Sequence, residues 1–303
     1  MKPILRQNET RYVLLEFLAI TFLATGGIFV KMSALSPINT GMYRVLFAIP
    51  VLFFMARKNM DNLKKTDFLL LFFAGVFLAG DIALWNMAFH YTTVANANLL
   101  TNLTPFLVVP VSFFFLKEEM PKLFLPGLAI TLLGVFFLIG GKASPNPSNY
   151  LGDLLAFGAC FFYAGFILIS YRLRDRFTSS VIMFISSIGT FCTLVLISIL
   201  TEGIQIPKDA SELLPILGLT FCLQIVGHNL LSHCQGKLNV NLSSVICLLQ
   251  TVVASLYSYF FFSETLTYKE IFGILIVILG VMIVKAQYSK KKSSQSCRSS
   301  VLE

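Results

Sequence analysis

Long apolar runs separated by short polar segments fill this chain from beginning to end. Ten runs are each about 20 residues long, which is the length an α-helix needs to cross the hydrocarbon core of a bilayer. The period-2 alternation of a membrane-spanning β-barrel is missing, so backbone groups are expected to bond within helices. We therefore predict an all-α integral membrane protein with ten transmembrane helices, at 12–34, 37–57, 67–89, 92–116, 121–141, 150–171, 179–201, 213–235, 240–262 and 268–287.

Composition and charge agree with this prediction and add an orientation. Hydrophobic residues make up 56% of the chain and charged residues 13%, whereas a soluble domain has about 25% charged residues. If the N-terminus is cytoplasmic, 18 of the 23 Lys and Arg residues fall on the inside, four fall outside, and Arg44 lies within a span. This bias predicts that both termini are cytoplasmic. It also explains the net charge of +8 without a nucleic-acid partner.

The spacing of the cysteine and histidine residues predicts no cofactor and no metal site. The six cysteines lie mostly inside spans, and no CxxC or Cys/His ligand spacing occurs. The first apolar run has no cleavage site before the next span, so it is expected to be a helix and not a signal peptide. Residues 288–303 are rich in Ser and Lys, which predicts a disordered basic tail at the cytoplasmic membrane surface.

An internal repeat divides the chain into two halves. FFFLKEEMPKLFLPGLAITLLG and YFFFSETLTYKEIFGILIVILG align at a shift of 146 residues. Because each half contains five spans, the second half enters the membrane in the opposite sense, which is typical of secondary transporters with a substrate site between the repeats. The expected halves are 12–141 and 150–287. Glycines seven apart share a helix face and favour close helix packing. The aligned pairs are Glu118 and Glu264, Gly127 and Gly273, and Gly134 and Gly280.

These features resemble the drug/metabolite transporter superfamily, in particular its EamA branch. The resemblance rests on the two five-helix halves, an Arg in the second span, the segment YTTVANANLLTNLTPFLVVPV leading to a Glu, and the GxxxxxxG of the next span. It implies a metabolite carrier with a central cavity, alternating access and no nucleotide hydrolysis. The chain also lacks the phosphate loop GxxxxGK[ST]. Thr251 stands where the first half has Pro105, and the seventh span has no match for Arg44, so the halves have specialised.

Charged side chains inside spans are costly and usually face a bundle interior or a wet cavity. Asp81 and Arg44 are expected at similar depth, roughly 12 Å and 10 Å from the outer ends of their helices. They form either a structural ion pair or part of a substrate-binding lining. Glu16, near the cytoplasmic end of the first span, either snorkels to water or serves as a protonatable group in the inner vestibule. Asp81 and Glu16 are the candidates for coupling to protons.

Uncharged polar residues complete the candidate cavity. In the fourth span Asn98, Thr101 and Asn102 share one face, which predicts interhelical hydrogen bonds or a cavity lining. Trp85 follows Asp81 by one helical turn and belongs either to the interfacial aromatic belt or to a site for a planar or cationic substrate. The candidates in the second half are Tyr163, Gln224, His228, Gln250 and Tyr257.

The sequence thus predicts a secondary transporter, an exporter or exchanger, that moves small polar metabolites such as amino acids across a bilayer. S-Adenosylmethionine or another aromatic cation is the alternative substrate class. An enzyme is disfavoured because no HExxH or GxSxG motif occurs. A non-transporting membrane scaffold is the alternative of a different class. The short loops favour a bacterial inner membrane.

Overall fold

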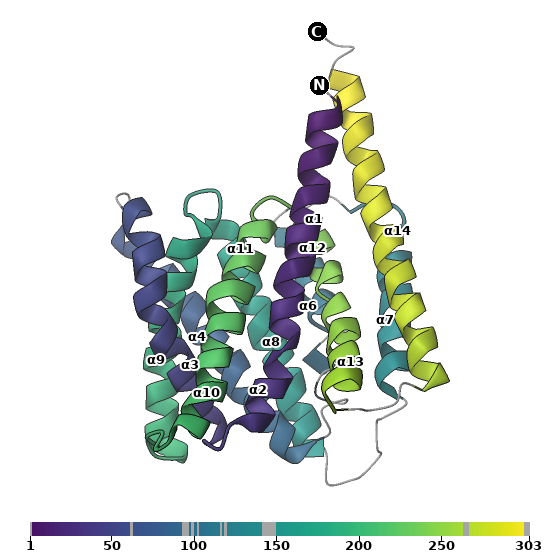
Figure 1. The fold of residues 1–303 in the computed structure, drawn as a ribbon. Helices are drawn as coiled ribbons and strands as arrows, with labels where there is room; N and C mark the ends of the chain where they lie inside the picture. Colours follow the sequence, from purple (N-terminus) through teal and green to yellow (C-terminus); the bar gives the residue numbers. More distant parts are fainter. Residues whose placement is uncertain are drawn as a thin grey trace.

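All the elements that the computed structural model describes are helices, arranged side by side in one bundle (Figure 1). The structure describes residues 2–60, 63–92, 97, 100–101, 103–115, 117, 120–140, 150–262 and 267–299. The helices are α1 (Lys2–Ala24), α2 (Gly26–Met32), α3 (Pro37–Ala56), η1 (Arg57–Asn59), α4 (Lys65–Tyr91), α6 (Thr104–Phe115), α7 (Phe124–Gly140), α8 (Tyr150–Leu173), α9 (Ser179–Thr201), α10 (Ala210–Gly218), η3 (Leu219–His228), α11 (Asn229–Gln235), α12 (Val240–Ile246), α13 (Leu249–Phe262) and α14 (Tyr268–Ser299).

The membrane character of these helices is evident from their length and their surface. Eight helical segments are long and apolar enough to cross a bilayer, and Thr104–Phe114 and Phe124–Phe137 are shorter apolar helices. Large apolar side chains point outward on several of them, such as Phe54, Phe114 and Leu200, which are 62%, 73% and 75% exposed. Such a surface suits lipid and not water. The chain is therefore an integral membrane protein, and the count of ten spans stays a prediction.

Both chain ends lie at the same face of the bundle, which we call the terminal face (Figure 1). Helix α1 begins there and α14 ends there, and residues 57–60, 174–178 and 236–239 lie on that side as well. Side chains fix this end locally: Asp67, in the first turn of α4, accepts hydrogen bonds of 2.6 and 2.8 Å from Arg176. An acidic residue in this position also complements the positive end of the helix dipole.

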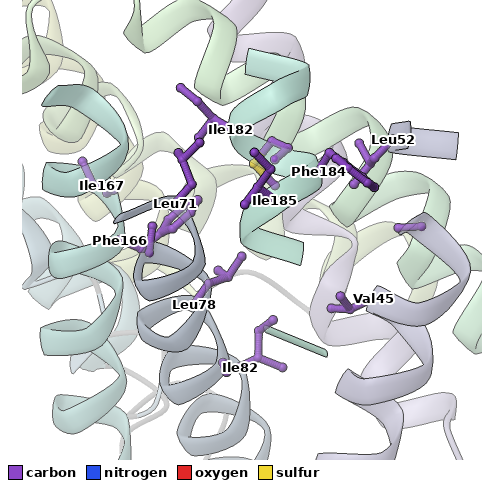
Figure 2. Packing of buried hydrophobic residues seen from close by; sticks show 14 of the residues in the cluster. Val45, Leu52, Leu71, Leu78, Ile82, Phe166, Ile167, Ile182, Phe184 and Ile185 are labelled. Carbon is purple, nitrogen blue, oxygen red and sulfur yellow. The ribbon is translucent and has the colours of Figure 1, made fainter. Parts of the chain in front are cut away.

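One apolar core joins helices from both parts of the chain (Figure 2). It is built by α3, α4, α8 and α9, whose side chains interdigitate at full burial. The labelled members are Val45, Leu52, Leu71, Leu78, Ile82, Phe166, Ile167, Ile182, Phe184 and Ile185. A second core joins residues of α1, α6, α7, α12, α13 and α14. A third, smaller core joins Leu219 and Leu223 of η3 to Ala19 and Leu23 of α1. The polar groups of the candidate site lie on helices that contribute to these three cores.

The repeated glycines lie where α7 packs along α14, which run side by side in Figure 1. A Cβ on Gly134 would lie 2.5 Å from the backbone nitrogen of Val277 and 2.9 Å from the carbonyl oxygen of Gly273. A Cβ on Gly280 would lie 2.6 Å from the backbone nitrogen of Thr131. Only glycine permits this approach, so the packing role predicted for Gly134 and Gly280 is confirmed.

Several helix boundaries differ from the expected spans. The first apolar run breaks at Thr25, where the backbone tightens and Gly26 lets Leu223 approach, so α1 and α2 are separate helices. The run from 240 to 262 is likewise divided into α12 and α13. Helix α14 continues to Ser299, although composition predicts disorder from residue 288. No Gly or Pro occurs between 288 and 299 to end the helix.

Candidate functional site

Arg44 enters the bundle interior from α3 and is only 3% exposed. Its Nη2 donates to Oε1 of Gln224 at 3.2 Å, and the Nε2 of Gln224 donates to Oγ of Ser187 at 3.1 Å. Thr220 donates a further hydrogen bond of 3.1 Å to the carbonyl oxygen of Arg44. The predicted residues Arg44 and Gln224 therefore meet, and they do so across the two halves of the chain.

Gln224 occupies this place on an unusual helix. Residues Leu219–His228 form a π-helix, which is wider than an α-helix and is rare except as short insertions that often mark functional sites. It carries Thr220, Gln224 and His228, all buried. The sequence analysis did not predict this π-helix. The polar residues are visible in the sequence, but their polarity does not indicate how many residues each helical turn contains.

Asp81 and Arg44 interact electrostatically across α4 and α3. No direct hydrogen bond between them occurs in the described residues, and the Arg44 side chain donates to Gln224 instead. Asp81 also lies within electrostatic reach of Cys160 and Tyr163 of α8. Tyr163 in turn packs its ring edge-on to His228, with centroids 6.4 Å apart. These residues form a polar group in the bundle interior, in which Asp81 and Tyr163 are half-buried and the others are buried. We call it the Arg44 group: Arg44, Asp81, Tyr163, Ser187, Gln224 and His228.

The other predicted cavity residues have individual surroundings. Trp85 is half-buried and packs edge-on to Phe89 at 4.6 Å, and it also lies against Gly26. The hydroxyl of Thr101 donates to the carbonyl oxygen of Ala97 at 3.0 Å. Tyr257 donates to the carbonyl oxygen of Thr21 at 3.2 Å, and Gln250 is half-buried. Asn98, Asn102, Glu118 and Glu264 lie outside the described residues.

Glu16 is fully buried, so its carboxyl does not snorkel to the surface. Its Oε1 accepts a short hydrogen bond from Ser243 of α12 and contacts the thiol of Cys247 at 3.9 Å. Arg174, immediately after α8, interacts with it electrostatically. Arg174 was missed by the sequence analysis because it was assigned to a cytoplasmic loop. Its closeness to a buried acid on the first helix depends on folding alone.

Nothing in the described part of the chain resembles a metal centre. No group of three or more His, Cys, Asp and Glu side chains comes together there. Two of the three histidines make ring contacts, His228 with Tyr163 and His233 with Tyr12 at 6.0 Å.

Comparisons with known proteins place this arrangement in a family. The sequence profile of the EamA-like transporter family matches twice, at residues 10–140 and 150–286. The chain belongs to this family. The two matched segments supply the two sides of the Arg44 group: Arg44 and Asp81 from the first, and Ser187 and Gln224 from the second.

Individual relatives share most of their length with this chain. A protein of Salmonella typhimurium named "Probable amino-acid metabolite efflux pump" is 24% identical over 254 residues, covering 80% of this chain and 83% of that protein. An "Uncharacterized transporter" of Archaeoglobus fulgidus is 26% identical over 272 residues, covering 88% and 84%. A solved crystal structure superposes with a TM-score of 0.75 at 18% identity and covers 90% of this chain and 96% of that one. That likeness shows the fold.

Proposed function

We propose that this protein is a secondary transporter that moves small polar metabolites, with amino acids as the favoured class, by alternating access. The supporting observation is the Arg44 group, a set of charged and polar side chains that are mostly buried and that come from both segments matching the family. Buried charges inside a membrane bundle are expensive and usually mark substrate or ion pathways. Ten helices in two inverted halves, with cytoplasmic termini in a bacterial inner membrane, complete the proposal.

The charges in the group favour a substrate with both a positive and a negative end. Arg44 offers a positive charge and Asp81 a carboxyl group, and the two are not hydrogen-bonded to each other. Gln224 and Ser187 add uncharged donors and acceptors. A phosphorylated substrate would require several intramembrane cations. Of the six residues of the Arg44 group, only Arg44 carries a fixed positive charge. The amino-acid efflux pump named among the relatives points to the same substrate class.

An aromatic cation is a weaker candidate because of the surroundings of Trp85. A free indole face beside Asp81 would suit such a ligand. In the structure the ring packs edge-on to Phe89 and lies against Gly26, where a Cβ would be 3.5 Å from Cη2. These contacts hold the ring in packing roles, so the amino-acid class is preferred.

The test is efflux from proteoliposomes loaded with a whole-cell metabolite extract. Wild-type protein should release specific compounds that empty vesicles retain, as identified by mass spectrometry. Asp81→Asn should reduce that release at least about 10-fold if it removes one charged interaction with the substrate. The exposed Asp175→Asn should release the same compounds at the wild-type rate. No release by folded wild-type protein, under exchange conditions or either direction of pH gradient, would contradict the transporter proposal and favour a scaffold.

A further inference from the structure

A second polar cluster lies nearer the terminal face than the Arg44 group. Four segments meet there: α1, the connection after α8, the end of α11 and the beginning of α12. Their contributions are Glu16, Arg174, Gln235 and Ser243. We call these residues the Glu16–Arg174 cluster. Glu16 belongs to the first segment that matches the family and the other three residues to the second, so this cluster also joins the two halves of the chain.

The carboxyl of Glu16 has one occupied and one unoccupied oxygen. Oε1 accepts the hydrogen bond from Ser243, while Oε2 is buried and has no hydrogen-bond partner among the described residues. The side chain is 0% exposed. A buried carboxylate oxygen without a partner is costly in a protein interior, and more so in a membrane where water is scarce. The arrangement leaves an acceptor for one more donor.

Arg174 and Gln235 have buried donor nitrogens without hydrogen-bond partners among the described residues. Nη2 of Arg174 donates to Oε1 of Gln235, but Nε and Nη1 are buried without partners among the described residues. The Nε2 amide of Gln235, a residue only 2% exposed, is likewise unpartnered. Burial lowers the pKa of Arg174 to about 10, which still leaves the guanidinium charged at neutral pH. This side of the cluster therefore offers donors and a positive charge.

Glu16 and Arg174 interact electrostatically but do not form a hydrogen bond with each other. Instead, Glu16 bonds to Ser243 and Arg174 bonds to Gln235. A structural ion pair would use these vacant atoms on one another, as Asp67 and Arg176 do at 2.6 Å. The vacancies instead leave one unpartnered carboxyl oxygen on Glu16 and several unpartnered donors on Arg174 and Gln235. The ligand that complements both is a small zwitterion.

We propose that the Glu16–Arg174 cluster binds the zwitterionic head of an α-amino acid, with its carboxylate on Arg174 and Gln235 and its ammonium on Glu16. This inference rests on the proposed transport function and deepens it by naming the part of the substrate that is recognised. The cluster is separate from the Arg44 group, and Tyr163 lies within electrostatic reach of both Asp81 and Glu16. It provides a second binding place for the same head group nearer the terminal face.

The test measures head-group selectivity and not flux alone. Vesicles carrying wild-type protein are loaded with a mixture of common amino acids, and each transported species is challenged with its decarboxylated amine and its des-amino acid. Wild-type protein should discriminate against both analogues. Arg174→Gln should weaken the apparent affinity for the amino acid by about 10-fold to 100-fold and lose discrimination against the amine. Glu16→Gln, which keeps an acceptor for Ser243, should lose discrimination against the des-amino acid.

Matched variants separate this inference from the wider proposal. Arg174→Lys retains the charge and should recover part of the discrimination against the amine, even if Arg174→Gln folds poorly. Arg172→Gln and Asp175→Asn change exposed charges beside the cluster and should behave as wild type. Transport with unchanged selectivity in folded Arg174→Gln and Glu16→Gln would overturn the zwitterion site while leaving the transporter proposal intact. Absence of any transport by wild-type protein would instead overturn the proposed function itself.

Discussion

A close crossing of helices α4 and α9 predicts a large effect of a single methyl group. Helices α4 and α9 meet at Gly75 and Gly189, and their backbones are held there by hydrogen bonds. Ser186 donates to the carbonyl oxygen of Leu71 at 3.1 Å, and Thr190 donates to that of Gly75 at 2.9 Å. Because α4 and α9 belong to different matched segments, this crossing joins the two halves of the carrier.

The size of the effect of Gly75→Ala follows from the contacts of the added carbon. A Cβ at Gly75 would lie 2.1 Å from the carbonyl oxygen of Ser186 and 2.8 Å from the backbone nitrogen of Thr190, whereas ordinary contacts begin near 3.4 Å. Both obstacles are backbone atoms, so the helices must separate. Overpacking of this kind costs about 1–3 kcal/mol. Loss of two interhelical hydrogen bonds adds about 0.6 kcal/mol each, which gives roughly 2–4 kcal/mol.

Unfolding in mixed SDS micelles, followed by circular dichroism, measures this change. Gly27→Ala is the matched control, because a Cβ there would have nothing within 4 Å. Alanine is also the better helix former, so the control should be neutral or slightly stabilising. A stability for Gly75→Ala within about 0.5 kcal/mol of the control would refute the claim that backbone contact at this crossing holds the halves together.

Two further predictions concern the charge pairs. If Arg44 and Asp81 serve mainly as a structural pair, Arg44→Gln should destabilise the fold by about 3–5 kcal/mol. The double variant with Asp81→Asn should then recover much of that stability in the same unfolding assay. If the two residues line the substrate path, the double variant should regain stability but not transport. At the terminal face, Arg176→Gln should cost about 1–2 kcal/mol, less than a fully buried pair, because the Arg176 side chain is 50% exposed. Adding Asp67→Asn should then cost little more, and a strictly additive loss would contradict the pairing.

The helical membrane architecture was predictable because it depends on the hydrophobicity of long runs of residues. Runs of about 20 apolar residues require helices in a bilayer, and glycines at matched positions require close packing. The backbone contacts at Gly134 and Gly280 agree with that prediction. Local interruptions were not predictable in the same way. The break at Thr25 and the π-helix of η3 change the backbone within an unbroken apolar run.

The candidate site was predictable in its polar members and not in their partners. Arg44, Asp81 and Gln224 were recognisable because charged and amide groups are rare in spans. That Gln224 would accept from Arg44 required the relative rotation of two helices, which sequence spacing does not define. Arg174 was missed for a related reason. Loop arginines usually serve orientation, and only the fold brings this one beside a buried Glu16.

The central claim, that the buried polar group is exposed to each side of the membrane in turn, is tested most directly with Cys160. This thiol is fully buried, hydrogen-bonds with Thr104 and lies within electrostatic reach of Asp81. A variant that retains Cys160 alone among the cysteines should be placed in oriented vesicles and treated from one side or the other with a membrane-impermeant cationic methanethiosulfonate. The account predicts modification from both sides, slowed by the transported metabolite. Modification from one side only, or from neither side in folded protein, would contradict it.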